Sequence, residues 1–394
     1  MKYILHIDMN SFFASCEAID HPEYLNKPLA VSGKTKRSVV CSANYLARSY
    51  GVKAAMPIYM AQKLCKNLIV VIPHFDLYHH YSELFINVIQ TQFTNIIEIG
   101  SIDECYADIT SLVNAKNDPL SIAKRIQIAI KRATGLGCSI GIANIKFLAK
   151  MGSEYKKPMG ISTMWKQELP TKLWPQPIEN MFWIGRSTAQ LLRKNGITTI
   201  GDLAKKENKS LLQKLLDKNW VVHYEHANGI GDDTLDLSHN TPKSIGSSET
   251  FLNDTDDFDE IKGKLIELTR DSFNRLQRHE LQCKTLNVSI KTPDFKLHTK
   301  SLTLTKYIND FEQILLKIIT LYQNNFADKT IRLVGVSFSN LFDNRQVEFT
   351  NELFDDYYKS PDKQETSNAM DEIIQKINHK FAKNIIDTAK NKIS

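Results

Sequence analysis

The order of strand-like and helix-like patterns is the feature of this chain that most limits its fold. Residues 3–8 (YILHID) alternate along a predicted strand that Asp8 closes, and a helix is expected to begin near Asn10 and Ser11. Residues 96–100 and 105–109 predict a second pair of strands, residues 123–133 a helix, and residues 138–143 another strand. This alternation predicts a mixed layer of helices and strands.

The pattern changes character twice after that layer. From residue 169 to about residue 204 the spacing is helical but interrupted by Gly185 and Gly196, which predicts a small domain of short helices. The turn-rich residues 226–243 predict a linker. Beyond them, residues 261–276 and 310–322 predict helices, and residues 286–290, 302–304 and 331–338 predict strands. We therefore expect a multidomain α+β chain, since roughly 100 to 200 residues make one domain.

Composition narrows the class of protein without identifying it. The cysteines are scattered without a CxxC pair, so we expect free buried thiols rather than disulfides or a zinc site. No stretch approaches the roughly 20 apolar residues that span a bilayer, so we expect a soluble, cytoplasmic protein without a membrane partner. The formal net charge of +6 is compatible with a phosphate-rich partner but is not specific for one.

Two predicted strand ends carry acidic residues, Asp8 at one and Asp103 with Glu104 at the other. Neighbouring residues on a regular strand face opposite sides, so Asp103 and Glu104 share a site only if the backbone turns there. Gly100 and Ser101 favour such an irregular segment. Converging carboxylates repel one another, and Mg²⁺ would remove that repulsion and support phosphoryl transfer. From these residues alone, ordinary surface acids remain the commoner interpretation.

Four motifs in a fixed order carry more information than the acids alone. They are DMNSFFASCE at residues 8–17, SANYLAR at 42–48 with GVKAAMP at 51–57, SIDE at 101–104, and KFLAKMGSEYKKPMG at 146–160. Together they resemble the Y-family translesion DNA polymerases, most closely the bacterial members. KSIGSSETF at residues 243–251 and IRLVGVSFSNL at 331–341 extend the resemblance, which covers most of residues 1–345.

The resemblance implies a right-hand polymerase. Its expected parts are a palm (residues 1–10 and 76–165), small fingers (11–75), a helical thumb with a helix-hairpin-helix (166–235), a linker (236–242), a little finger (243–345) and a C-terminal tail (346–394). The implied activity is template-directed, low-fidelity insertion of deoxynucleotides opposite damaged bases, without proofreading. A nucleotidyl cyclase with a palm-like sheet and a non-catalytic DNA-binding accessory protein remain as alternatives.

The resemblance also implies the metal site. Asp8 and Asp103 would bridge two Mg²⁺ ions, Glu104 would hold the catalytic ion, and the carbonyl of Met9 would assist. Many relatives carry a second acid where this chain has Asn10. That position is not usually a metal ligand in the family, so we expect Asn10 to leave catalysis intact.

Nucleotide contacts are expected on both sides of that site. Ser42, Tyr45, Arg48 and Lys157 match the family's phosphate contacts, and Tyr45 and Arg48 would share one face of a helix. Without the resemblance, a tyrosine packed on a surface arginine is the simpler interpretation. Of Phe12 and Phe13, one is expected in the core. By resemblance, Phe12 and Phe13 both contact the nucleotide, and Phe13 is the steric gate that excludes a ribose 2′-hydroxyl.

DNA contacts are expected in two further places. Residues 181–192 resemble a helix-hairpin-helix in which Gly185 supplies the turn and the backbone at Arg186 and Ser187 faces a phosphate, although Trp183 stands where relatives usually carry glycine. In the C-terminal domain, a basic sheet face is expected along the duplex, made by Lys291, Lys296, Lys300 and Arg332. The tail is a candidate sliding-clamp peptide, and we expect a monomer.

Overall fold

The computed structural model describes residues 1–238 and 242–343. The chain divides into two compact units, Met1–Asn240 and Thr241–Ser394, and the boundary falls inside the turn-rich residues 226–243. The tail in which a sliding-clamp peptide is expected, residues 346–394, lies outside the described residues.

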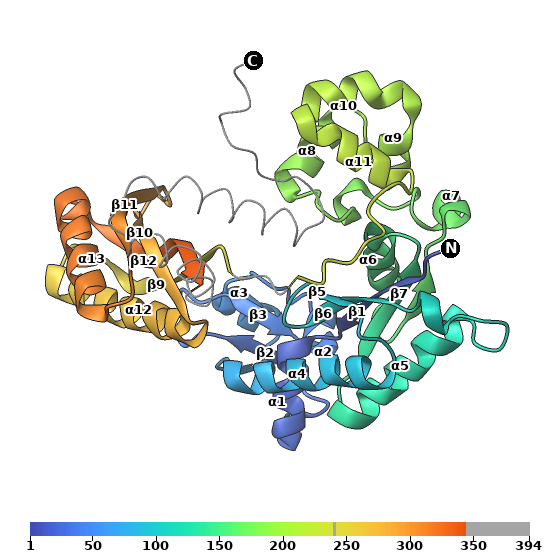
Figure 1. Cartoon of the computed structure of the whole chain (residues 1–394), viewed down its shortest axis with the longest axis horizontal. Helices are drawn as coiled ribbons and strands as arrows, with labels where there is room; N and C mark the ends of the chain where they lie inside the picture. The colour runs from blue at the N-terminus through green and yellow to red at the C-terminus, as the bar shows by residue number, and fades with distance from the viewer. Residues whose placement is uncertain (239–241, 344–394) are drawn as a thin grey trace, which may run out of the picture. The chain divides into compact units, whose positions relative to one another are not determined.

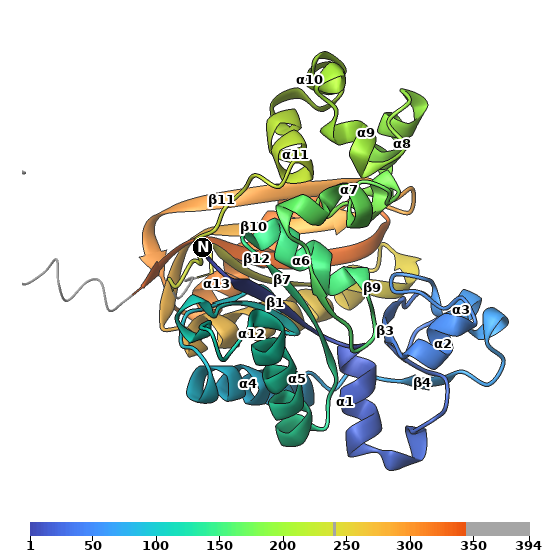
Figure 2. The ribbon, with the colours of Figure 1, turned by 90° about the vertical axis from the view of Figure 1, so that its right-hand side faces the viewer.

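A five-stranded sheet forms the centre of the first unit (Figure 1), in the order β5-β6-β1-β7-β8. The central strand β1 (Ile4–Met9) is antiparallel to both β6 (Glu104–Asp108) and β7 (Cys138–Ala143), and the edges are β5 (Ile97–Ile99) and β8 (Ile161–Thr163). Helices α4 (Phe75–Gln92) and α5 (Pro119–Thr134) cover one face, and α6 (Lys146–Tyr155) covers the other (Figure 2). The sheet is thus enclosed between two helical layers.

Alternation along β1 decides which side chains reach which helical layer. Leu5 and Ile7 belong to the core that α4 and α5 close, whereas Ile4 belongs to the core beneath α6. His6 and Asp8 follow Ile4 at steps of two residues and therefore point to the α6 side. Asp8 is the last of these side chains and lies beside the segment that follows α6.

A smaller sheet, β3-β2-β4, is inserted in the sequence between β1 and α4. It comprises β2 (Leu29–Ser32), β3 (Val40–Ala43) and β4 (Ile69–Val71), accompanied by α1 (Phe12–Asp20), α2 (Tyr45–Ser49) and α3 (Ile58–Leu64). Asn44 caps α2, because its Oδ1 accepts from the N–H of Ala47 (2.9 Å), and the same oxygen accepts from the N–H of Leu29 (3.1 Å). One amide therefore ties α2 to β2.

Short helices complete the first unit, as the sequence predicts. They are α7 (Leu169–Lys172), α8 (Arg186–Lys194), α9 (Ile200–Ala204), α10 (Lys209–Leu216) and α11 (Trp220–Ala227). Gly201 allows a close approach, because a Cβ at this position would lie 2.9 Å from the Cβ of Trp174. The helices share one apolar core with α6, to which Leu148 and Leu203 both belong.

The second unit is a four-stranded antiparallel sheet with two helices. The order is β11-β10-β12-β9, with β9 (Ser244–Thr255), β10 (Leu281–Lys291), β11 (Leu297–Ile308) and β12 (Ile331–Asp343). Helices α12 (Phe258–Arg278) and α13 (Phe311–Phe326) cover one face, where Leu265 and Ile318 join Val288 and Phe338 in one core. We call the opposite face, on which the described residues place no helix, the open face.

The strands and helices expected within the described residues are present, and the α+β class is confirmed. Strand β9 was not predicted, because its sequence SIGSSETFLNDT has few apolar residues to mark an alternation. Helix α5 begins earlier than expected, at Pro119, because Asp118 caps it through the N–H of Leu120 (2.9 Å). None of the helices within the described residues is long and apolar enough to cross a membrane.

Candidate active site

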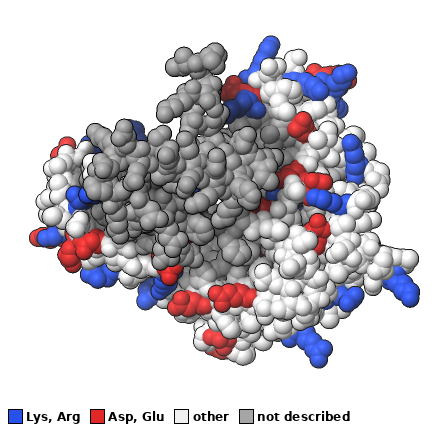
Figure 3. All heavy atoms as spheres, viewed as in Figure 1, with Lys and Arg blue, Asp and Glu red and all other residues white. Residues whose placement is uncertain are grey.

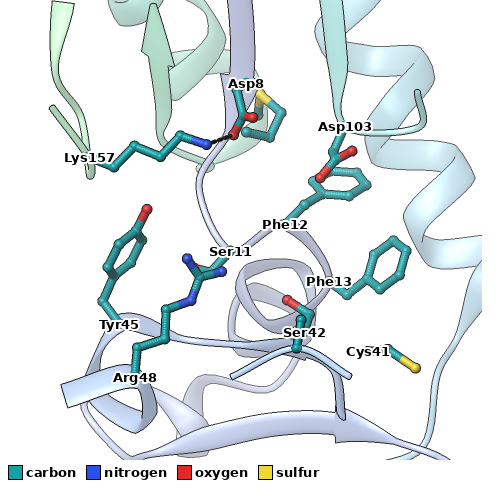
Figure 4. Close-up of a pocket in the computed structure, with 12 residues that line it drawn as sticks. Asp8, Ser11, Phe12, Phe13, Cys41, Ser42, Tyr45, Arg48, Asp103 and Lys157 are labelled. Carbon is teal, nitrogen blue, oxygen red and sulfur yellow. Dashed lines mark ion pairs between the residues drawn. The ribbon is translucent and has the colours of Figure 1, made fainter. Parts of the chain in front are cut away.

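A cavity of about 200 Å³ opens beside the end of β1 (Figure 4). Residues from the β1–α1 segment, from β3 and α2, from the approach to β6 and from the segment after α6 form its walls. The lining residues are Asp8, Met9, Ser11, Phe12, Phe13, Cys41, Ser42, Tyr45, Arg48, Ala54, Asp103 and Lys157. The fold therefore brings together two expected acids, the expected phosphate-binding side chains and the expected gate.

Asp8 is a buried carboxylate compensated by a lysine. Its Oδ1 lies 2.8 Å from Lys157 Nζ, and the two side chains are only 13% and 19% exposed. Burial raises the pKa of Asp8 to about 6, although the charge of Lys157 acts in the opposite direction. Lys157 Nζ also donates to Glu154 Oε1 (2.7 Å). The ionised form of Asp8 would therefore gain from a further cation.

The backbone turns before β6, and this turn separates the two acids of the SIDE segment. The N–H groups of Gly100 and Ser101 both donate to the carbonyl of Glu104 (3.0 and 3.1 Å), and Ser101 Oγ donates to Asp103 Oδ1 (2.6 Å). Asp103 lines the cavity. Glu104 lies opposite Asp8 in the strand register and points to the α6 side. The two neighbouring acids thus lie on different sides of the strand end.

Glu104 is held by partners from α6 and β1. Its Oε2 is 2.5 Å from Lys150 Nζ, and His6 Nε2 lies 3.4 Å from the same oxygen. Burial alone would raise the pKa of Glu104, but the contacts with His6 and Lys150 lower it to about 2. His6 is completely buried and its Nδ1 is hydrogen-bonded to Ser153 Oγ (2.7 Å). Glu104 is therefore ionised and its direction is fixed in this structure.

Asn10 has a structural role, because its side-chain amide hydrogen-bonds two neighbouring segments. Its Nδ2 donates to Ser139 Oγ (2.9 Å), and its Oδ1 accepts from the N–H of Met159 (2.8 Å). The residue is 7% exposed and is not among those that line the cavity. These contacts hold the end of β1 against β7 and the loop after α6.

The expected phosphate-binding residues converge from two elements (Figure 4). Ser42 lies on β3, and Tyr45 and Arg48 extend from α2 into the space below Lys157. The Arg48 guanidinium lies over the Tyr45 ring, 4.8 Å from its centroid, and its Nε donates to the carbonyl of Ala43 (2.8 Å). Tyr45 and Arg48 thus pack on each other and also line the cavity.

The two phenylalanines at the start of α1 differ in burial. Phe12 is 3% exposed and belongs to the core, as expected for one member of the pair. Phe13 is half-buried and reaches the cavity. Ser11, Cys41 and Ala54 also line the cavity but were not predicted from the sequence. Ser11 and Cys41 are next to Phe12 and Ser42 in the sequence, and this position could have indicated them. The expectation that all cysteines are buried is wrong for Cys41, because its position on β3 is exposed.

The donor chemistry around the end of β1 suits a hard cation, but the side chains are not gathered into a metal site. Within residues 1–238 and 242–343, no three His, Cys, Asp or Glu side chains are close enough to hold one ion. Met9 N–H donates to the carbonyl of Asp103 (2.9 Å), and Asp8 is paired with Glu104 in the register. The backbones of the expected ligands are therefore adjacent, while Glu104 is directed to Lys150.

The helical hairpin differs from the expectation at its turn. Gly185 has a φ of −74° and precedes α8, whereas Trp183 adopts the left-handed φ of 74°. The prediction that Gly185 supplies the turn is therefore wrong: Trp183 takes the conformation that glycine tolerates best. Arg186 and Ser187 are exposed at the start of α8, which has no side-chain cap. The first N–H groups of α8 thus remain available to an anion.

The expected basic face of the C-terminal sheet is not formed as predicted. Lys291 is paired with Leu297 and Lys300 with Val288, which belongs to the helix-covered core. Paired residues share a face and the faces alternate, so Lys291 and Lys300 lie on opposite faces. Lys296 forms an ion pair with Asp294 (2.8 Å), and Arg332 with Asp254 (3.6 Å). On the surface that Figure 3 shows in colour, basic and acidic side chains lie among one another.

The open face is instead rich in hydroxyl groups and glycine. The register brings Ser289, Gly335 and Ser248 into one row across three strands, and Asn287, Ser337 and Gly246 into the next. A Cβ at Gly335 would lie 2.7 Å from Ser289 Oγ and 2.9 Å from Ser248 Cβ, so a larger residue would displace its neighbours. This face has the small, uncharged, polar side chains that can approach a polar surface closely.

Comparisons with known proteins agree with this architecture. The impB/mucB/samB family matches residues 7–154, and the C-terminal domain of that family matches residues 242–350. The chain is 38% identical to DNA polymerase IV of Oceanobacillus iheyensis over 395 residues, covering 99% of this chain and 92% of the relative. It is 36% identical to DNA polymerase IV of Ureaplasma parvum over 356 residues, covering 90% and 98%.

Solved structures show the same fold. A Y-family DNA polymerase chimera of Dbh and Dpo4 matches with a TM-score of 0.77 and 25% identity, covering 87% of this chain and all of the other. DinB from Sulfolobus solfataricus matches with a TM-score of 0.57 and 26% identity over the same share. The resemblance to Y-family polymerases is confirmed, and the chain belongs to the impB/mucB/samB family.

Proposed function

We propose that this protein is a DNA-directed DNA polymerase that inserts deoxynucleotides opposite damaged template bases by two-metal phosphoryl transfer, with low fidelity and without proofreading. The cavity beside β1 supports this most directly, because acids suited to metal ions, cations suited to phosphates and an aromatic ring line one space. A nucleotidyl cyclase or a non-catalytic accessory protein fits less well, since the relatives of similar length are named DNA polymerase IV.

The proposed metal ligands are Asp8, Asp103 and Glu104, with the carbonyl of Met9, around two Mg²⁺ ions. Their oxygens are hard ligands of the kind that Mg²⁺ prefers, and a divalent ion would offset the cost of burying the Asp8 charge. When bound, the ions supply activation of the primer hydroxyl and neutralise charge on the transferred phosphoryl group. Glu104 is already ionised, so it needs no proton release to act as a ligand.

The proposed triphosphate contacts are Ser42, Tyr45, Arg48 and Lys157. Hydrogen bonds from charged donors to phosphate are among the strong ones, and Arg48 and Lys157 both reach the cavity. The Arg48 guanidinium is oriented by the Tyr45 ring and by the carbonyl of Ala43 (2.8 Å). These residues would hold the triphosphate in the cavity beside the end of β1.

Phe13 is the proposed steric gate, and Phe12 supports it from the core. The ring centroids of the two residues are 5.8 Å apart. Both residues line the cavity, but Phe12 is only 3% exposed and belongs to the core, whereas Phe13 is half-buried, and this difference supports Phe13 as the gate. A ribose 2′-hydroxyl would collide with that ring, whereas a deoxyribose would pack against it.

The proposed DNA contacts lie outside the cavity. The uncapped start of α8, at Gly185, Arg186 and Ser187, offers N–H groups to a backbone phosphate. In the C-terminal unit we propose that the open face contacts the duplex with its hydroxyl groups and Lys291, while Lys296, Lys300 and Arg332 act from its surroundings. Neither surface reads the base sequence.

Primer extension tests the proposal directly. Incubation with a primed template, deoxynucleotides and Mg²⁺ is expected to give template-dependent extension, also across an abasic site, that is lost in Asp103→Asn. Formation of a cyclic nucleotide would support the cyclase instead, and DNA binding without any reaction would support the accessory protein.

We further propose a sliding-clamp contact through residues 346–394, a monomeric state and a cytoplasmic location. Deletion of residues 346–394 is expected to reduce extension in the presence of a clamp and to leave extension without a clamp unchanged.

A further inference from the structure

A buried polar contact behind the proposed gate has no part in the polymerase chemistry described above. Glu17, on α1, is 0% exposed. Its carboxylate accepts a hydrogen bond from the Tyr78 hydroxyl, and His74 Nδ1 lies 3.0 Å from both of its oxygens. A buried carboxylate needs such donors, because leaving it without them costs on the order of several kcal/mol. Glu17 therefore fixes the start of α4 against α1.

Tyr78 connects Glu17 with Phe13. Phe13 and Glu17 are four residues apart on α1, so they lie on the same side of that helix. The Tyr78 ring is stacked on the Phe13 ring, with centroids 4.2 Å apart and an interplanar angle of 11°. Burial also raises the pKa of Tyr78, so its hydroxyl remains a donor to Glu17. Tyr78 thus touches α1 at two points, one turn apart.

Phe75 limits movement of the gate in another direction. Its ring meets the Phe13 ring edge-on, with centroids 6.1 Å apart and an angle of 82°, and it meets the Tyr78 ring at 5.8 Å and 77°. Phe75 directly follows His74, the second donor to Glu17. The carboxylate of Glu17 therefore holds Tyr78 directly and Phe75 through its neighbour His74, and neither ring lines the cavity.

We propose that Glu17 is a positioning residue for sugar discrimination. Through Tyr78 and His74 it keeps the Phe13 ring advanced toward the cavity, so that a ribose 2′-hydroxyl does not fit. The inference rests on the proposed gate role of Phe13. Glu17 lines no part of the cavity and contacts none of the proposed metal ligands, so it acts through the position of the ring.

The test compares kcat/KM for a deoxynucleotide with kcat/KM for the matching ribonucleotide on one undamaged template. Tyr78→Phe removes the hydroxyl and keeps the ring. Glu17→Gln weakens the group that accepts the hydrogen bond from Tyr78. Each is expected to lower discrimination roughly three- to tenfold, the equivalent of one hydrogen bond, mainly by lowering KM for the ribonucleotide. Tyr81→Phe is the matched control, because Tyr81 lies one turn further along α4 and packs on the same core.

The double variant Glu17→Leu with Tyr78→Phe separates an effect on the position of the Phe13 ring from an effect on the folding free energy. Replacing both polar partners by apolar groups recovers much of the folding free energy, yet discrimination is expected to stay low. Discrimination that returns with stability, or equal losses for both sugars, would overturn the inference. In a Phe13→Ala background, Glu17→Gln is expected to have no further effect on discrimination. If Phe13→Ala itself leaves discrimination unchanged, the gate assignment fails; if only the Glu17 and Tyr78 variants are silent, this inference alone fails.

Discussion

The cavity beside β1 and the open face of the C-terminal sheet are both proposed to contact substrate, but they are built differently. In the cavity, charged side chains are partly buried and fixed by partners, as in the 2.8 Å contact between Lys157 and Asp8. On the open face, uncharged groups hold one another across strands, as in the Thr285–Thr303 hydroxyl pair at 3.0 Å and the Ser301–Asn287 pair at 2.7 Å.

This difference separates two kinds of effect. A charge in the cavity acts at low local dielectric on one reacting group, so its removal affects one step strongly. A hydroxyl on an exposed sheet contributes a small, replaceable interaction with the backbone of the duplex. Substitutions in the cavity should therefore change chemistry with little change in DNA affinity, and substitutions on the sheet should do the reverse.

Asp103→Asn is expected to have the largest effect. Loss of one metal-binding charge removes several kcal/mol of transition-state stabilisation, so kcat should fall by roughly a thousandfold or more. Binding of primer-template, measured by fluorescence anisotropy without nucleotide, should change less than about twofold. A comparable loss of DNA affinity would show that the cavity and the DNA-holding surfaces are not separate.

Phe13→Ala comes next. Removing the ring opens space for one hydroxyl, so discrimination against ribonucleotides is expected to fall by roughly 10 to 200-fold, the range for one additional group in a pocket. Single-nucleotide insertion with matched deoxy- and ribonucleotides measures it. Phe93→Ala, on the α4–α5 side of the same domain, serves as a control that removes a partly buried ring distant in sequence from the site. Equal discrimination in Phe13→Ala and the wild type would contradict the gate.

Lys157→Met should raise KM for the nucleotide by roughly tenfold or more, because a charged hydrogen bond contributes about 1.5 to 3 kcal/mol. Steady-state insertion kinetics measure this effect. Lys156→Met is the matched control, since Lys156 is exposed at the neighbouring position and does not line the cavity. Equal effects of the two variants would indicate a general electrostatic contribution in place of a specific contact.

Asp8→Asn is expected to stabilise the metal-free protein while abolishing activity. The raised pKa of about 6 means that the folded protein holds a proton on Asp8 more tightly than the unfolded chain does. The ionised aspartate therefore destabilises the fold above about pH 6 by on the order of 2 to 3 kcal/mol, and this deficit disappears below about pH 4. Thermal unfolding with a chelator should show it between these pH values. A variant that is less stable at pH 8 would contradict the burial argument.

The smallest effect is expected on the sheet. Substitution of Lys291, Lys296 and Lys300 together by glutamine should lower the slope of log affinity against log salt by less than about 2, although each free phosphate contact contributes about 0.9. Lys296 is already paired with Asp294, and Lys300 points away from the open face. Lys262→Gln, on the exposed side of α12, is the control. A decrease in this slope that corresponds to all three phosphate contacts would support a single basic face.

Much of the fold was predictable because its determinants are local. The strand at residues 138–143 coincides with β7, and alternation in YILHID correctly marks β1. The faces of the β10–β11 hairpin, in contrast, depend on its register: Lys291 is paired with Leu297, so Lys300, three residues further along β11, lies on the other face. This explains why lysines that are close in sequence were wrongly assigned to one face.

The candidate site was predictable as a set of residues but not as an arrangement. Motifs placed Asp8, Phe13, Arg48 and Lys157 in one region, and the structure brings them to one cavity. The direction of the Glu104 side chain depends on Lys150, which approaches from a helix far along the chain. Likewise, the contact of Glu17 with Tyr78 links positions 61 residues apart, and no local pattern indicates it.

Lys150 joins the central sheet to the short helices of the first unit. Its ammonium group is 2.5 Å from Glu104 and also lies over the ring of Phe182, 4.7 Å from the centroid. One cation thus serves an acid on the sheet and an aromatic ring in the hairpin that precedes α8. If Phe182 moved away, Lys150 would contact Glu104 without the aromatic ring. If Glu104 rotated away, Lys150 would keep only the contact with Phe182. The position of Phe182 and the orientation of Glu104, a proposed metal ligand, are therefore linked through a single side chain.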